Sequence, residues 1–147
     1  MASFKFSSKE NFDGLVTNLQ KELNEAVEDI VLDIKRVSSE SAPHKTGALE
    51  KSVTYSVKEL KSGRINGTVK YKIKKGGFDY SIKMHEDFYK LGPQSQQKPG
   101  GKSQFAGGKT VPVGRKYLEN AVLYGEDGYA KHLEDAINKA IKNSEIK

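Results

Sequence analysis

The sequence predicts an α+β fold. We expect a long N-terminal helix, an antiparallel sheet of about three to five strands, and a C-terminal helical segment packed on one face of that sheet. Three observations support this. Apolar residues recur with the helical period of about 3.6 over residues 8–38, alternate with a period of two between residues 49 and 86, and return to the helical period over residues 114–143. At 147 residues the chain fits a single domain, 1–147, with a lean core.

The first predicted element is the helix over residues 8–38. Its apolar positions form one stripe: Phe12, Leu15, Val16, Leu19, Leu23, Ala26, Val27, Ile30, Val31, Ile34 and Val37. Its other face is acidic: Glu22, Glu25, Glu28, Asp29 and Asp33. Such a helix spans roughly 45 Å at about 1.5 Å per residue, which exceeds what a compact domain of this size requires. We therefore expect this helix, with Glu25 and Glu28, to contact another subunit.

Pro43 is expected to end this helix, because proline disfavours the α conformation of the residue before it. Strands are then expected over about 49–60, 64–75 and 78–86. The first two form a hairpin around a glycine turn, with one apolar face. That face carries Val53, Tyr55, Val57, Ile65, Gly67, Val69, Tyr71 and Ile73. Outward lysines such as Lys70 and Lys72 discourage edge-to-edge aggregation and are also available for partner contact.

Residues 92–110 are rich in glycine, lysine and glutamine and nearly devoid of apolar residues. We predict a flexible loop here, because so little apolar surface cannot offset the entropy lost on ordering. Lys102 and Lys109, each following a glycine, are candidate partner contacts. The helical period then resumes over 114–143, with an interruption predicted at Gly125 and Gly128.

Charge is unevenly distributed along the chain, whose net charge is +6. Residues 1–36 carry five basic and seven acidic side chains, whereas residues 45–116 carry sixteen basic and five acidic ones. A basic middle favours nucleic acid or an acidic protein surface as partner, although an ordinary solvated sheet face has the same composition. The chain has no cysteine, and it shows neither a signal peptide nor an apolar run of membrane-spanning length. A soluble, cytoplasmic protein is expected.

Signals for catalysis are weak. None of the three histidines has metal-ligand spacing, and the two Gly-Lys-Ser/Thr steps lack the leading glycine of a phosphate-binding loop. Asp79, Glu86 and Asp87 would suit a divalent cation only if the fold brings them together. We therefore predict no enzyme activity and no catalytic, cofactor-binding or metal-binding residues.

A series of short motifs resembles a family of tailed-phage proteins described as tail-completion, head–tail joining, neck or minor capsid proteins. The motif residues are Pro43, Thr46, Gly47, Leu49 and Ser52, then Tyr80, His85 and Glu86, then Tyr117, Leu118 and Ala121. The family order is the first signature, a hairpin, a Tyr-rich strand ending in an acidic step, a Gly-rich loop, and an aromatic-Leu-x-x-Ala helix. The resemblance covers nearly the whole chain.

The resemblance implies a structural virion protein, made in the bacterial cytoplasm, which forms a ring at the tail end or neck. That ring, of six copies if it matches tail symmetry, would complete the tail and join it to the head. Its partners would be tail-tube or tail-terminator proteins, head-connector proteins and DNA passing through the channel, with no membrane and no cofactor. The alternative is a basic nucleic-acid-binding protein that uses the Lys-rich hairpin and the Gly-Lys loop.

Overall fold

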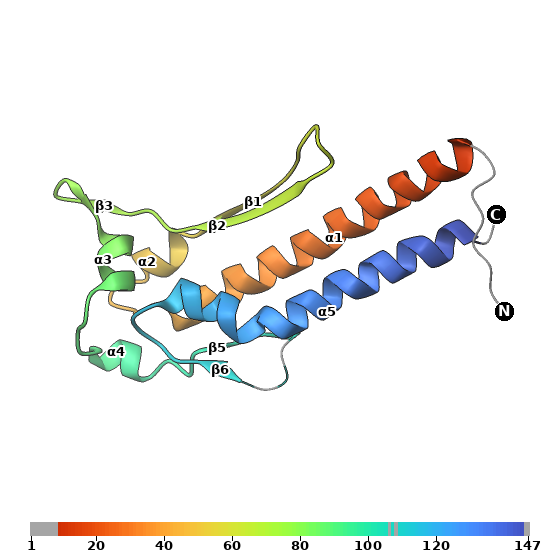
Figure 1. Cartoon of the computed structure of the whole chain (residues 1–147). Coiled ribbons are helices and arrows are strands. Elements are labelled where there is room, and N and C mark those ends of the chain that lie inside the picture. Colours follow the sequence, from red (N-terminus) through yellow and green to blue (C-terminus); the bar gives the residue numbers. More distant parts are fainter. Residues whose placement is uncertain (1–8, 106, 108, 146–147) are drawn as a thin grey trace.

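The computed structural model describes residues 9–105, 107 and 109–145 and has an α+β fold, as predicted. Two long helices form its spine, α1 (Lys9–Ser41) and α5 (Tyr117–Glu145), which run antiparallel along each other. A hairpin extends over α1, and the shorter elements gather at the end away from the termini (Figure 1). The hairpin consists of β1 (Thr54–Glu59) and β2 (Ile65–Lys70). The other elements are α2 (Ala48–Lys51), β3 (Lys74–Lys75), β4 (Phe78–Asp79), α3 (Tyr80–Glu86), α4 (Pro93–Gln96), β5 (Gly101–Lys102) and β6 (Thr110–Val111).

The N-terminal helix ends at Ser41, two residues before Pro43, as the proline predicts. The predicted first residue, position 8, lies outside the described residues. Ser41 binds both strands of the β5–β6 pair, since its hydroxyl donates to the carbonyl of Val111 (3.1 Å) and accepts from the amide of Gly101 (2.9 Å). The helix terminus therefore anchors the later segment as well as stopping α1.

The C-terminal helix packs against α1 and not on a sheet face, which corrects the predicted packing. It is also continuous, so the predicted interruption at Gly125 and Gly128 was wrong. Gly125 instead makes room for a side chain one turn later. A Cβ at Gly125 would lie 2.4 Å from the Tyr129 ring, and that ring must lie back along the helix to reach Asp33 on α1. Small residues, Ala26, Ala121, Ala136 and Ala140, are buried in the two helices.

The predicted hairpin forms with antiparallel pairs such as Tyr55↔Val69 and Val57↔Gly67. Its alternation follows the prediction. The side that carries Gly67 faces α1, where an added Cβ would come within 2.4 Å of Val31, so only glycine allows this close approach. Glu59, on the same side, accepts a hydrogen bond from Asn24 of α1 at 3.2 Å. The polar residues that alternate with these along each strand face away from α1.

Within the described residues, three separate two-stranded sheets, β1–β2, β3–β4 and β5–β6, replace the predicted sheet of three to five strands. The predicted strand 78–86 was wrong beyond Asp79, where α3 begins. Asp79 caps this helix, because its carboxylate accepts from the amide of Ser81 at 2.9 Å. A short run of alternating apolar residues is compatible with a strand or with a helix, and here the Asp79 cap favours the helix. The expected strand 49–60 likewise begins only at Thr54, after α2, and the strand 64–75 is broken between β2 and β3.

Residues 92–110 contain α4, β5 and the first residue of β6, so the expectation of a loop without regular structure was wrong. Positions 106 and 108 of this segment lie outside the described residues. Gly101 contacts α1 so closely that a Cβ would lie 2.3 Å from the carbonyl oxygen of Val37. The ammonium of Lys98 donates to the carbonyls of Ser39 (3.1 Å) and Ala42. The described part of the segment is thus fastened to the end of α1.

Candidate functional site

The motif residues that the sequence separates lie at the end of the molecule away from the termini. Leu49 and Tyr117 are buried in one apolar cluster with Ala42, and Tyr71, Ile73, Met84 and Leu118 pack against it. The ring of Tyr117 meets that of Tyr71 edge-on at 5.0 Å, and its hydroxyl donates to the carbonyl of Ser81 at 2.9 Å. Burial raises the pKa of the Tyr117 phenol, which stays a neutral donor. Ala121 is buried in a neighbouring cluster with Val37 and Val111.

Residues of the first motif shape the turn between α1 and β1. Pro43 is buried, and Gly47 adopts a φ of 83°, which favours glycine. The hydroxyl of Thr46 accepts from the amide of Ala48 at 3.3 Å, and that of Ser52 donates to the carbonyl of Leu49 at 2.7 Å. Each of these residues has a structural role in starting or ending α2, which presents Leu49 to the cluster.

Tyr80, His85 and Glu86 lie on α3, where an ion-pair group joins this helix to the start of α5. Lys116 contacts Glu86 at 2.6 Å, and the Lys116 hydrogen bond, with help from His85, lowers the pKa of that carboxyl. The Glu119 amide donates to His85 Nε2 at 3.3 Å, so Nδ1 of the neutral ring donates to Glu86 at 2.9 Å. The His85 ring also packs edge-on against Tyr117 at 5.0 Å.

A cavity of about 450 Å³ opens beside the first motif, between α2, α3 and α4. Its walls are mainly apolar and aromatic and include Pro43, Leu49, Tyr80, Met84, Tyr89, Leu91 and Pro93. Lys45, Lys75 and Lys90 also line it, whereas none of the residues lining it is acidic. The Lys75 ammonium lies over the Tyr80 ring, 4.4 Å from its centroid. Burial raises the pKa of Tyr89 to about 12, and its hydroxyl donates to the Met84 carbonyl at 2.6 Å.

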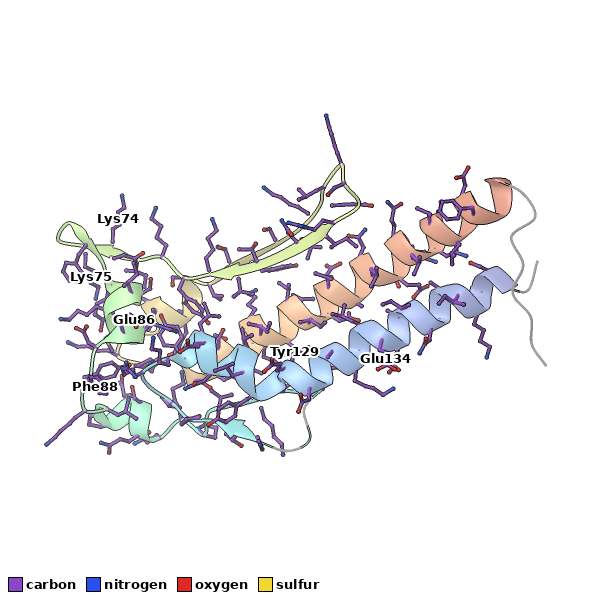
Figure 2. The ribbon with its side chains drawn as sticks, viewed as in Figure 1. Lys74, Lys75, Glu86, Phe88, Tyr129 and Glu134 are labelled. Atoms are coloured by element: carbon purple, nitrogen blue, oxygen red, sulfur yellow. The ribbon has the colours of Figure 1, made fainter. Side chains whose placement is uncertain are left out.

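This cavity was missed by sequence reasoning, because its walls come from segments without a shared periodicity. Figure 2 shows Lys74, Lys75 and Phe88 at the end of the molecule away from the termini, with Glu86 between α3 and α5. Phe88 is 86% exposed and stacks under Arg115 at 4.1 Å, and Ile82 is 61% exposed. Large apolar side chains therefore reach the surface around this end.

The residues predicted to contact partners are all exposed but do not form one patch. Glu25 and Glu28 lie on α1, whereas the four lysines lie in or beside β2, β5 and β6. Lys70 ends β2, Lys72 follows it, Lys102 ends β5, and Lys109 precedes β6. The acidic face of α1 is narrower than predicted, because Glu22 and Asp33 are buried. Glu22 pairs with Lys139 of α5 at 3.4 Å.

Asp33 is the most connected of the buried carboxylates. It accepts from the hydroxyls of Ser103 and Tyr129 (both 2.6 Å), from the amide of Gln104 (3.2 Å) and from Arg36 (2.9 Å). Burial alone would raise the pKa of Asp33, but these hydrogen bonds outweigh it and the net pKa is lowered. The carboxylate joins α1, α5 and the 92–110 segment and serves as a structural centre.

The carboxylates considered for a cation are engaged elsewhere. Asp79 caps α3, Glu86 binds Lys116, and Asp87 pairs with Lys83 at 3.2 Å. Within the described ranges, no group of three or more histidine, cysteine or acidic residues is placed to hold a metal ion. In the same part of the chain, no helix is both long and apolar enough to cross a membrane.

No family model, curated protein or solved structure matches the chain. The motif residues and the surfaces of this molecule are therefore the features that bear on its function.

Proposed function

We propose that this protein is a structural subunit of a tailed phage or prophage. It forms a ring, of six copies in our proposal, which completes the tail and joins it to the head. The observation that carries the proposal is the meeting of the separate motifs. Leu49 of the first motif and Tyr117 of the last are buried together, and His85 of the middle motif packs on the same tyrosine ring. Residues that resemble one family in sequence thus form one structural unit.

The surface also favours assembly over catalysis. Large apolar side chains are exposed at both ends of the described molecule, among them Phe12, Ile82 and Phe88. A protein contact would remove these side chains from water. Ring closure requires two different patches on each subunit, and the acidic residues of α1 and the basic hairpin lie on different elements. Partners in this role are tail-tube or terminator proteins, head-connector proteins and the DNA in the channel.

Deletion of the gene from an inducible phage tests this role. We expect electron microscopy to show DNA-filled heads and tails of about normal length, but few joined particles. Supplying the wild-type chain from a plasmid should restore joining. Reversing the charge of Glu25 with Glu28, or of Lys70 with Lys72, should block that rescue while circular dichroism shows a folded subunit. Normal infectious particles from the deletion strain would refute the proposal.

The outward face of the hairpin favours a second candidate, nucleic-acid binding. This face is polar and basic, with Lys58, Asn66, Thr68 and Lys70 on the two strands. A protein that neutralises phosphates with these lysines should lose affinity steeply as salt increases. Titration of duplex DNA at two or more salt concentrations distinguishes the candidates. Salt-independent or absent binding excludes this second function, whereas tight, steeply salt-dependent binding together with normal joining would establish it.

A further inference from the structure

The cavity beside the first motif has the chemistry of a site for an apolar group with acidic neighbours. Its volume of about 450 Å³ lies in the range of ligand and peptide sites. Its walls are mainly apolar, its charged rim residues are Lys45, Lys75 and Lys90, and none of its lining residues is acidic. An apolar side chain would lose contact with water inside it, and carboxylates at its mouth would meet the three ammonium groups.

A surface with the complementary chemistry lies on α1. Leu32 is 39% exposed although it is an apolar residue in the middle of a long helix. Glu25, Glu28 and Asp29 are exposed at positions three to seven residues before it, so helical geometry places all four on one face. Asp29 also accepts from His132 of α5 at 3.0 Å, which holds that carboxylate in place. We name this set, Glu25, Glu28, Asp29 and Leu32, the acidic leucine patch.

We propose that the cavity of one copy receives the acidic leucine patch of a second copy, with Leu32 inserted and the carboxylates facing Lys45, Lys75 and Lys90. Charge complementarity argues for this occupant, because the charged residues that line the cavity are lysines and the charged members of the patch are acidic. The basic residues that follow Leu32 on α1 are engaged within the same copy, since Lys35 lies over the Tyr55 ring and Arg36 pairs with Asp33 and Glu40. The two surfaces lie on different parts of the molecule, since the cavity is formed beyond the end of α1. The contact is therefore heterologous and leaves each copy with one free surface of each kind. This inference names the partner surface within the ring of the proposed function and rests on it.

Cysteine trapping in the full-length chain tests the contact directly, because the protein has no native cysteine. Glu28→Cys and Ala48→Cys would place one thiol in the patch and one at the cavity. Oxidation should produce a ladder of disulfide-linked copies on a non-reducing gel, about tenfold stronger than in a control. The matched control joins Glu28→Cys with Lys61→Cys at the hairpin tip. Linkage at the control level would overturn the proposal.

Charge exchange provides a second measurement, by sedimentation of the purified chain. Lys45→Glu with Lys90→Glu should weaken self-association about tenfold, and Glu25→Lys with Glu28→Lys should weaken it equally. Combining all four should restore it, whereas Lys58→Glu with Lys61→Glu, the same charge change at the hairpin, should have no effect. Failure of the combined variant to recover would overturn the proposal.

A third outcome concerns a small ligand. Binding of anilinonaphthalene sulfonate in the cavity, with no disulfide ladder, would assign the cavity to small apolar anions and overturn the proposal. The deletion experiment separates this inference from the proposed function. Unjoined particles without the ladder would remove the inference alone, whereas a ladder with fully infectious deletion phage would remove the phage role alone.

Discussion

Replacing Asp33 by alanine tests whether one buried carboxylate holds the 92–110 segment and α5 on α1. The change removes the acceptor for the hydroxyls of Ser103 and Tyr129 and for the Arg36 guanidinium. Hydrogen bonds to a charged group contribute about 1.5–3 kcal/mol each, and they are not additive. Breaking a buried charged network typically costs about 3–5 kcal/mol. We therefore expect Asp33→Ala to lower the free energy of unfolding by that amount, or the melting temperature by on the order of 10 °C.

Urea denaturation measures the loss, and Asp135→Ala is the matched control. Asp135 pairs with Lys131 at 2.7 Å on the exposed surface of α5, and such pairs contribute about 0–1 kcal/mol. Limited trypsin digestion of Asp33→Ala should also cut earlier at Lys102, whose carbonyl accepts from Arg36 at 2.7 Å. A loss below about 1 kcal/mol, or digestion no faster than in the control, would refute a structural centre at Asp33.

The pH dependence has a definite sign. The folded pKa of Asp33 is lowered, so its contribution is fully present above the unfolded value of about 3.9 and is lost as pH falls through the folded pKa. The stability difference between the wild-type chain and Asp33→Ala should therefore be constant at neutral pH and shrink below about pH 4. Urea titrations at several pH values check this, and a difference that grows as pH falls would contradict it.

Three other substitutions test the packing at the cavity end. Gly101→Ala should destabilise the fold by about 1–3 kcal/mol or more, because the Cβ would meet the Val37 backbone, and urea denaturation should show it. Tyr117→Phe should cost about 1 kcal/mol through its lost bond to the Ser81 carbonyl, and an unchanged unfolding midpoint would contradict that bond. Leu118→Ala should cost about 2 kcal/mol, at the low end for buried leucines because Leu118 is half-buried, and an unchanged melting temperature would place it outside the core.

The sequence by itself determined the elements whose evidence is local. The apolar period of residues 8–38 and Pro43 located α1 and its end, because helix spacing and the proline restriction act within one or two turns. The alternation through Tyr55 and Val69 predicted the two faces of the hairpin, because a strand turns its side chains to opposite sides at every residue. The sequence also identified Leu49 and Tyr117 as residues of two motifs that resemble one family, although it did not predict that these two residues meet in the core.

Only the tertiary structure decided the rest, because those features depend on contacts that the local pattern of apolar residues does not encode. Asp79 caps α3 where the alternating apolar residues predicted a strand, and its carboxylate also accepts from the amide of Ile73 at 3.1 Å. The 92–110 segment is poor in apolar residues, yet hydrogen bonds to Asp33 and Ser41 of α1 hold it. In the continuous α5, the Tyr129 ring lies over Gly125 because its hydroxyl reaches Asp33 of α1. The lysine-rimmed cavity likewise exists only where α2, α3 and α4 meet, since no single segment contains its walls.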